Sequence, residues 1–360
     1  MEKAILVGLN SDALPVDECA DERSLAELAA LLETAGGVSA DTMLQKRDKP
    51  EPGTFIGTGK VEELKSKLNE NDCSLALFDN ALSPAQQRNL EEKLGVRVMD
   101  RAGIILDIFA QRAQTKEGRL QVELAQYRYL LPRLTGMWSH LVRQTASGGS
   151  RIGTRGPGET QLETDRRHIR AKITKLEQEL EKVRGVRTTQ RRLRSKNEKK
   201  TIALVGYTNA GKSTLLNAMT GAGIQAKDRL FDTLDTTTRR LRLPGGDEVL
   251  LSDTVGFIRK LPHQLIAAFK ATLEELTFAD VILHVIDVSH EDWQAQAEIC
   301  GKLITELGAG DTPRIDAYNK CDLAPDSVPR GKPDSVCVSA KTGEGLDNLL
   351  TQIEIHNNKL

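Results

Sequence analysis

The amino-acid sequence predicts an α/β protein in which a mostly parallel, doubly wound sheet is preceded by a small α/β domain and a long antiparallel helical hairpin. Strand-like apolar runs alternate with helical patterns in residues 1–115 and again in residues 197–360, as in sheets covered by helices. Between these regions, residues 116–196 have apolar residues at helical spacing and one glycine-rich interruption. We therefore divide the chain into three domains with these boundaries.

The first domain is predicted from alternating strand and helix signals. The strand-like runs span residues 4–9 and 74–79, and the helical patterns span residues 24–34 and 83–94. Pro84 opens the last helix, because proline is tolerated at the first helical position. A glycine-rich turn over residues 53–60 precedes another helical pattern and resembles an anion-binding turn. It leaves open whether this domain binds a second nucleotide such as ATP.

The middle domain is predicted to be a basic hairpin. A helical pattern over residues 116–143, with a break expected at Pro132, leads into residues 147–158, which contain five glycines, and a second helix follows. Residues 116–200 hold 21 Lys and Arg against 9 Asp and Glu, whereas the remainder holds 29 against 42. A basic segment between acidic flanks indicates a nucleic-acid partner, with RNA phosphate the obvious one. The alternative is a solvated hairpin with ordinary surface charges.

A phosphate-binding loop is the most informative motif of the third domain. It follows a strand-like run and leads into a helical pattern. Its residues are Gly206, Tyr207, Thr208, Asn209, Ala210, Gly211, Lys212 and Ser213. In that setting, backbone amides converge on an oligophosphate at the helix N-terminus, where the helix dipole favours negative charge. Lys212 would reach the β- and γ-phosphates, and the Ser213 hydroxyl would bind Mg²⁺. A glycine-rich turn without a ligand is the alternative.

Three further motifs follow in the order of a guanine-nucleotide switch, each after a strand-like run. They are Asp253, Thr254, Val255 and Gly256; Asn319, Lys320, Cys321 and Asp322; and Ser339, Ala340 and Lys341. The carboxyl ends of parallel strands share one edge of an open sheet, so the four motifs should converge there. Together they predict a site for GTP or GDP.

The second and third of these motifs would recognise guanine. The Asp322 carboxylate would accept hydrogen bonds from the base N1–H and its exocyclic amine, a donor pair that adenine lacks. Lys320 would lie over the base, and Asn319 would brace the loop. The Ala340 N–H would donate to the guanine O6. Selection of GTP over ATP therefore rests mainly on Asp322.

The hydrolytic machinery departs from the common pattern. Asp253 would hold Mg²⁺ through water, and the Gly256 amide would bind the γ-phosphate, so that Lys212, Asp253 and Gly256 are the candidate catalytic residues. Many switch GTPases place a glutamine directly after this glycine to orient the attacking water. Here the position is Phe257. Either hydrolysis is slow until a partner supplies the positioning, or the ring is retracted and a backbone-held water substitutes.

The segment between the loop and Asp253 contributes further candidates. Its candidate nucleotide-binding residues are Phe231, Asp232, Thr233, Leu234 and Asp235. A threonine must bind Mg²⁺ when GTP is bound, and four threonines in residues 231–239 leave the choice open. Asn209 could coordinate K⁺ beside the phosphates and so activate hydrolysis. Its alternative role is that of a turn residue that tolerates a left-handed backbone.

Composition indicates a cytoplasmic protein without a membrane span. No apolar run approaches the roughly 18 residues that a span requires, and the first residues lead into a strand rather than a signal peptide. The five cysteines are scattered, which suggests neither a disulfide framework nor a zinc site. His284 lies inside a strand-like run, and we interpret it as a core residue rather than a catalytic one.

Taken together, these residues resemble the HflX family of GTPases, relatives of Era and Obg, over nearly the whole chain. The specific marks are Gly-Tyr-Thr-Asn-Ala-Gly-Lys-Ser at 206–213, Asp-Thr-Val-Gly-Phe-Ile-Arg at 253–259, and Arg-Gly-Pro-Gly-Glu-Thr-Gln-Leu-Glu-Thr-Asp-Arg-Arg at 155–167. The resemblance implies a GTPase that binds the large (50S) ribosomal subunit and splits or rescues stalled or idle ribosomes. It also implies Thr233 as the second Mg²⁺ ligand and tolerance of a hydrophobic residue at Phe257.

The resemblance carries further expectations. We expect a monomer that hydrolyses GTP slowly, is stimulated by the ribosome, and contacts ribosomal RNA through the basic hairpin 116–200. Longer family members continue into a small C-terminal domain, whereas this sequence stops at Leu360, so any role of that domain is in doubt here. The alternatives are an RNA-remodelling or large-subunit assembly GTPase and a signalling GTPase with protein partners only.

Overall fold

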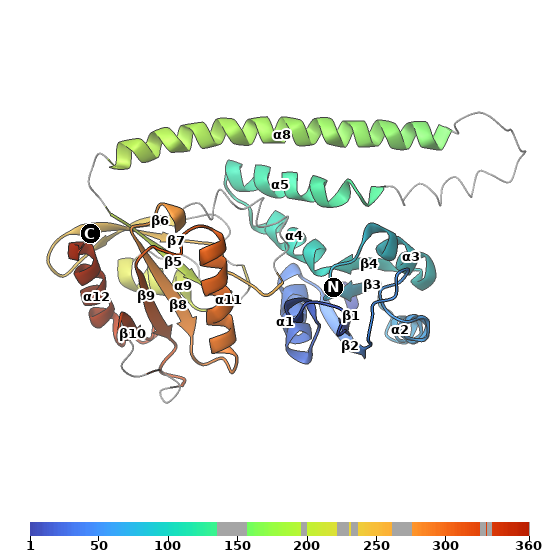
Figure 1. Ribbon diagram of the computed structural model, residues 1–360, viewed down its shortest axis with the longest axis horizontal. Coiled ribbons are helices and arrows are strands. Elements are labelled where there is room, and N and C mark those ends of the chain that lie inside the picture. The colour runs from blue at the N-terminus through green and yellow to red at the C-terminus, as the bar shows by residue number, and fades with distance from the viewer. Residues whose placement is uncertain are drawn as a thin grey trace, which may run out of the picture. The chain divides into compact units, whose positions relative to one another are not determined.

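The computed structural model of the chain contains two compact units, each built around one β-sheet (Figure 1). The first unit comprises residues 1–111 and 119–181, and the second comprises residues 112–118 and 182–360. The structure describes residues 1–134, 157–195, 200–221, 230–231, 237–260, 276–324, 329 and 333–359. The three-domain division drawn from the sequence stays a prediction.

A four-stranded parallel sheet forms the centre of the first unit. Its strands are β1 (Lys3–Asn10), β2 (Val38–Lys46), β3 (Leu75–Phe78) and β4 (Arg97–Asp100). The order across the sheet is β2-β1-β3-β4, and every neighbouring pair is parallel. The connections contain the short 3₁₀ helix η1 (Val16–Glu18) and the helices α1 (Glu22–Ala35), α2 (Thr58–Glu70) and α3 (Pro84–Leu94).

The two faces of this sheet follow from the alternation of side chains along β1. Ile5, Val7 and Leu9 share a core with apolar residues of α2 and α3. Gly8 points to the opposite face, where an added Cβ would lie 2.6 Å from the Ala20 Cβ and 3.3 Å from Leu25 of α1. Helices therefore cover both faces, as the sequence predicts.

The ends of the helices have the expected local chemistry. The Asp21 side chain caps α1 by accepting from the Ser24 N–H at 2.6 Å, and Gly36 ends the helix with a left-handed φ of 94°. Ser83 caps α3 in the same way, and Pro84 is the first helical residue, as predicted.

Three helices lie in and directly before the hairpin region. They are α4 (Arg101–Arg112), α5 (Lys116–Leu130) and α8 (Pro157–Ser195). α5 and α8 pack side by side, with ion pairs between Lys172 and Glu123 at 3.2 Å and between Arg128 and Glu177 at 2.6 Å. α5 ends at Leu130, two residues before Pro132, in agreement with the break expected there, and residues 135–143 of the predicted helical pattern lie outside the described residues. Most of the glycine-rich segment 147–158 lies outside the described residues.

The chain that leaves α5 is fixed to the carboxyl end of β4. The Arg133 guanidinium donates to Asp100 Oδ2 at 3.0 Å and to the Leu82 carbonyl oxygen at 3.1 Å. It also lies 3.6 Å from the centre of the Tyr129 ring, whose hydroxyl donates to Asp100 Oδ1 at 2.8 Å. Asp100 is buried, so these charge-assisted bonds are shielded from water.

A six-stranded sheet forms the centre of the second unit. Its strands are β5 (Thr201–Gly206), β6 (Thr237–Arg242), β7 (Glu248–Asp253), β8 (Val281–Asp287), β9 (Arg314–Asn319) and β10 (Ser335–Cys337). The order is β10-β9-β8-β5-β7-β6, and only the β6–β7 pair is antiparallel. Its described helices of more than one turn are α9 (Lys212–Thr220), α11 (Trp293–Glu306) and α12 (Leu346–Lys359).

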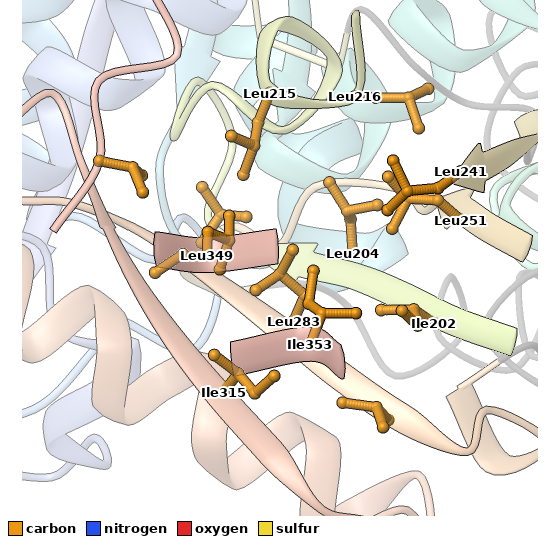
Figure 2. Packing of buried hydrophobic residues seen from close by; sticks show 14 of the residues in the cluster. Ile202, Leu204, Leu215, Leu216, Leu241, Leu251, Leu283, Ile315, Leu349 and Ile353 are labelled. Carbon is orange, nitrogen blue, oxygen red and sulfur yellow. The ribbon is translucent and has the colours of Figure 1, made fainter. Parts of the chain in front are cut away.

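Helices cover both faces of this sheet as well. On one face, leucines and isoleucines of α9 and α12 pack on the strands (Figure 2); labelled there are Leu215, Leu216, Leu349, Ile353, Leu204 and Leu283. On the other face, Trp293 of α11 contacts Tyr318 edge to face, with ring centres 5.8 Å apart. The predicted mostly parallel, doubly wound sheet is confirmed. Within the described part of the chain, no helix is long and apolar enough to cross a membrane.

Candidate nucleotide site

The predicted phosphate-binding loop lies between β5 and α9, at the carboxyl end of a central strand. Gly211 precedes the helix with φ 89°, and an added Cβ would lie 2.3 Å from the Asn319 Nδ2, so only glycine fits. Asn209 has φ 62° and an exposed side chain. The left-handed backbone by itself explains an asparagine at this position. Coordination of K⁺ would be a second role.

Lys212 is the first residue of α9 and points back over the loop. Its Nζ donates to the carbonyl oxygens of Tyr207 at 2.8 Å and Gly206 at 3.2 Å. The side chain is buried, and this burial lowers the pKa of the ammonium, against the opposing effect of the Asp253 charge. An ammonium group has three donors, so these two bonds orient the third. The third N–H donor of Lys212 is therefore available to bind a phosphate oxygen.

Ser213 and Asp253 bring together the oxygens that a magnesium ion prefers. The Ser213 hydroxyl donates to Asp253 Oδ2 at 2.7 Å, which joins the first turn of α9 to the end of β7. Thr254 is fully buried and donates to the Leu204 carbonyl oxygen at 2.6 Å, which fixes the backbone after Asp253. Hydroxyl and carboxylate oxygens are hard ligands, so this pair fits Mg²⁺. In the described part of the chain no cluster of three His, Cys, Asp or Glu suggests another metal.

Phe257 is retracted into the protein. Its side chain is only 1% exposed, and its backbone bridges both sides of Tyr207. The Phe257 N–H donates to the Gly206 carbonyl oxygen at 3.1 Å, and its own carbonyl accepts from the Thr208 N–H at 2.7 Å. The ring is thus retracted, and it cannot orient a water.

Asn319 joins three of the four motifs. Its Nδ2 donates to the Ala210 carbonyl oxygen at 2.8 Å, and its Oδ1 accepts from the Ala340 N–H at 3.0 Å. The side chain is buried, so both bonds are protected from water. Contact of the Ala340 amide with guanine O6 would therefore require that N–H to be shared with Asn319. Ser339 is buried beside it, whereas Lys341 is exposed.

The remaining residues of the third motif line the same edge. Asp322 is exposed, as a carboxylate that accepts from a ligand must be, and Cys321 is buried. Lys320 has φ 62°, and its Nζ forms an ion pair with Asp287 Oδ2 at 2.7 Å. Sequence reasoning missed Asp287, although it ends β8 and the rule that places motifs at carboxyl ends of strands covers it.

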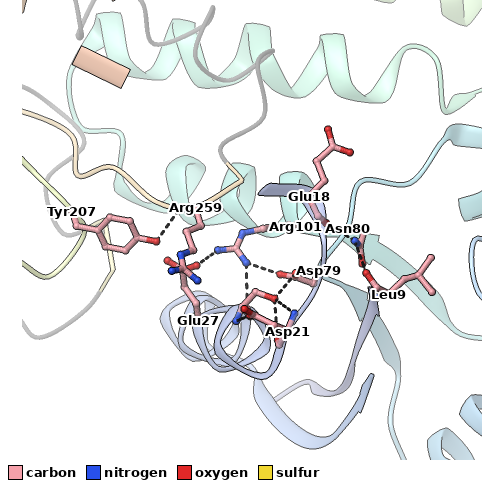
Figure 3. Close-up of polar contacts among 10 residues, drawn as sticks. Leu9, Glu18, Asp21, Glu27, Asp79, Asn80, Arg101, Tyr207 and Arg259 are labelled. Atoms are coloured by element: carbon pink, nitrogen blue, oxygen red, sulfur yellow. Dashed lines mark hydrogen bonds and ion pairs between the residues drawn. The ribbon is translucent and has the colours of Figure 1, made fainter. Parts of the chain in front are cut away.

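A second group missed from the sequence involves Tyr207. Its hydroxyl accepts from the Arg259 N–H at 2.8 Å (Figure 3), and the Arg259 guanidinium lies 3.8 Å from Asp292. No sequence signal identifies these partners. His284, by contrast, is a buried residue hydrogen-bonded to Asp316 at 3.1 Å, in agreement with its interpretation as core.

Part of the predicted site cannot be placed. Asp232, Thr233, Leu234 and Asp235 lie outside the described residues, so the proposed second Mg²⁺ ligand is among them. Phe231 is described and is buried, with φ 55°. The four motifs themselves meet at the edge of the sheet where β5, β7, β9 and β10 end.

Known proteins are similar to this chain over most of its length. GTPase HflX of Caldanaerobacter subterraneus subsp. tengcongensis is 50% identical over 353 residues, which cover 98% of this chain and 80% of that protein. GTPase HflX of Escherichia coli is 48% identical over 335 residues, which cover 91% of this chain and 78% of that protein. The chain belongs to the HflX family of GTPases.

Family models match most of the chain, and a solved structure shares its fold. The model described as GTP-binding GTPase N-terminal matches residues 22–110, GTP-binding GTPase Middle Region matches 112–194, and 50S ribosome-binding GTPase matches 201–320. A crystal structure of SsGBP in complex with GDP has a similar fold, with a TM-score of 0.52 and 23% identity over 100% of this chain and 99% of that one. As an HflX GTPase, the chain binds and hydrolyses GTP, and GTPases generally use Mg²⁺.

Proposed function

We propose that the chain is a GTP-dependent factor that binds the large (50S) ribosomal subunit and splits stalled or idle ribosomes. The observation that carries this proposal is the joining of three nucleotide motifs by one buried side chain, Asn319, in a domain that matches 50S ribosome-binding GTPases. GTP binding would then order the loops around the phosphates, and hydrolysis would time release from the subunit.

The nucleotide would be held by residues of all four motifs. Ser213 and Thr233 would bind Mg²⁺ directly and Asp253 would bind it through water, while Asp322 would select guanine. Because Phe257 is buried, the isolated protein has no side chain at that position to orient water. Basal hydrolysis should therefore be slow until the ribosome supplies the missing positioning.

The uneven charge of the hairpin region supports contact with ribosomal RNA at two places. Residues 157–183 hold six Lys and Arg against six Asp and Glu, so the body of α8 is neutral. Residues 135–156 hold three Lys and Arg and no acidic residue, and residues 184–200 hold eight against one. Phosphate contacts should concentrate in these two segments, because binding to nucleic acid follows the excess of positive charge.

Co-sedimentation with purified subunits tests the proposal. We expect binding to 50S but not 30S particles, stronger with a non-hydrolysable GTP analogue than with GDP, and a fall of light scattering when 70S ribosomes are mixed with protein and GTP. An assembly factor would instead bind immature particles without splitting 70S ribosomes. A signalling GTPase would not sediment with either subunit.

A pair of double variants tests the RNA contact. Arg151→Ala with Arg155→Ala removes two charges from the glycine-rich segment, whereas Arg167→Ala with Arg170→Ala removes two exposed charges from the neutral body of α8. We expect the first pair to weaken 50S binding and the second pair to leave it nearly unchanged. The affinity should fall with salt at a slope of about −0.7 to −0.9 per phosphate contact. Equal losses in both pairs would indicate diffuse attraction rather than a defined contact.

We also propose that Asn209 coordinates K⁺ next to the phosphates and so assists hydrolysis. Its exposed side chain in a left-handed turn projects from the loop that would surround the β- and γ-phosphates. Hydrolysis should be faster in K⁺ than in Na⁺ at equal ionic strength, and Asn209→Ala should remove the difference. Equal rates in both salts would leave Asn209 as a turn residue only.

A further inference from the structure

The side chain of Tyr207 connects the phosphate-binding loop to the segment that follows β7. Its hydroxyl accepts a hydrogen bond from the Arg259 N–H at 2.8 Å (Figure 3), and the side chain is 7% exposed, so water competes little for this bond. Arg259 lies three residues after Gly256 in the segment that follows β7. A side chain of the phosphate-binding loop therefore holds the backbone of residues 256–259, which we call the post-β7 segment.

The post-β7 segment is tied to its surroundings at two further points. Phe257 donates to the Gly206 carbonyl oxygen at 3.1 Å and accepts from the Thr208 N–H at 2.7 Å. The Arg259 guanidinium lies 3.8 Å from the Asp292 carboxylate, immediately before α11. The backbone bonds fix the start of the segment, and the Tyr207 hydroxyl fixes its end.

These hydrogen bonds and the ion pair hold Gly256 close to Lys212. A Cβ added to Gly256 would lie 2.9 Å from Lys212 Nζ and 3.0 Å from the Thr208 Cα. The ammonium group therefore occupies the space that a side chain at position 256 would need. An anion that accepts from Lys212 would meet the backbone of the post-β7 segment beside it.

We propose that Tyr207 is a positioning residue for the γ-phosphate. Its hydroxyl keeps the post-β7 segment docked on the loop, so the Gly256 amide is in place before GTP binds. This inference rests on the proposed role of that amide as a γ-phosphate donor. A donor held in advance avoids the cost of ordering it on binding. GDP has no γ-phosphate and gains nothing from this arrangement, so Tyr207 raises the preference for GTP over GDP.

The conservative variant Tyr207→Phe removes only the hydroxyl. The affinities of the full chain for fluorescent GDP and for a fluorescent non-hydrolysable GTP analogue are measured with Mg²⁺ present. We expect the ratio of GTP-analogue affinity to GDP affinity to fall roughly two- to tenfold, the loss of one net hydrogen bond. GDP affinity should change by less than about twofold, which is less than the effect of a single lost net hydrogen bond.

A second variant alters the contact of the post-β7 segment with Asp292, which lies outside the phosphate-binding loop. Asp292→Asn removes the charge that faces Arg259, and it should lower the same ratio by a smaller factor because the ion pair is longer and partly exposed. The effects of Tyr207→Phe and Asp292→Asn should not be additive, because both groups hold one segment. Tyr127→Phe on α5 is the matched control and should leave the ratio unchanged.

Three results would overturn the inference. An unchanged ratio in both variants would mean that the hydroxyl does not position the amide. An increased ratio would mean that the docked segment opposes GTP. An equal loss of both nucleotides would assign Tyr207 a structural role in the loop. If Tyr207→Phe fails to fold, as judged by thermal unfolding, the affinity ratio of Asp292→Asn still tests whether the docked segment favours GTP. Failure of the wild-type chain to bind GDP would instead contradict the nucleotide site itself.

Discussion

Replacement of Asn319 by alanine is the sharpest test of how the nucleotide motifs are held together. The side chain donates to the Ala210 carbonyl oxygen at 2.8 Å and accepts from the Ala340 N–H at 3.0 Å. It is 2% exposed and lies against Gly211. Asn319→Ala would remove both bonds and leave a gap under the phosphate-binding loop.

The expected cost follows from the two backbone groups that lose this partner. A buried polar group left without a hydrogen bond costs about 1–3 kcal/mol, so the two together cost about 2–6 kcal/mol before the loops relax. Because the loops lie at the open edge of the sheet, water can replace part of the lost bonding. We expect the free energy of unfolding to fall by about 2–3 kcal/mol.

Nucleotide affinity should fall with stability, because the variant frees the loop that binds phosphate and the loop that binds guanine. A loss of about 2–3 kcal/mol corresponds to binding weaker by a factor of roughly 30 to 160. GDP and a GTP analogue should weaken alike, since Asn319 contacts no part of the site that is special to the γ-phosphate. Urea denaturation and nucleotide titration measure the two quantities.

Asn89→Ala is the matched control for this variant. The Asn89 side chain donates to the Gly53 carbonyl oxygen at 2.9 Å in the other unit, so its loss should lower stability without altering GDP affinity. Wild-type GDP affinity in Asn319→Ala would refute the reasoning. Selective loss of the GTP analogue would also refute it, because the coupling would then act through the γ-phosphate.

Three other variants give separate tests. Asp322→Asn should weaken GTP binding roughly ten- to hundredfold and favour xanthine nucleotides, because the guanine amine loses its acceptor; unchanged GTP binding would contradict the assignment of Asp322. Lys212→Met should reduce GDP affinity more than about tenfold yet leave the unfolding free energy within about 1 kcal/mol of wild type, because burial already disfavours the ammonium and lowers its pKa; a large loss of stability without nucleotide would argue otherwise. Burial raises the pKa of Cys300 from 9.0 to about 12. A raised folded-state pKa contributes stability below pH 9 that is lost as pH rises toward 12, so the stability advantage of wild type over Cys300→Ala should shrink in that window by up to about 4 kcal/mol. A difference that does not vary with pH in denaturation experiments would contradict this.

The sequence predicted where the four motifs lie in the sheet, because these motifs depend on backbone geometry at strand ends. Gly211 needs a positive φ, and the order of apolar runs puts each motif at one edge of the sheet. The edge strand β2 was missed for a physical reason. Met43 is its one buried residue, so Val38–Lys46 has no apolar run that distinguishes it from a loop.

Other parts of the site could not be predicted because they depend on partners distant in sequence. The Tyr207 hydroxyl could have faced any donor, and its bond to the Arg259 N–H follows only from how β5 and β7 lie in the sheet. The burial of the Phe257 ring depends likewise on contacts with a distant segment, because its backbone is hydrogen-bonded to the phosphate-binding loop. The end of α5 near Pro132 was predictable, in contrast, because it depends on local backbone chemistry: proline disfavours helix in the residue before it.

The Arg133–Asp100 anchor has a mechanical consequence. Helix ends ordinarily fray, so a helix pulled at its terminus unwinds residue by residue. The end of α5 is instead held by charge-assisted bonds from Arg133 to Asp100 and by the Tyr129 hydroxyl on the same carboxylate. A load applied to the chain beyond residue 134 would thus act on the sheet through Asp100 before it could unwind α5.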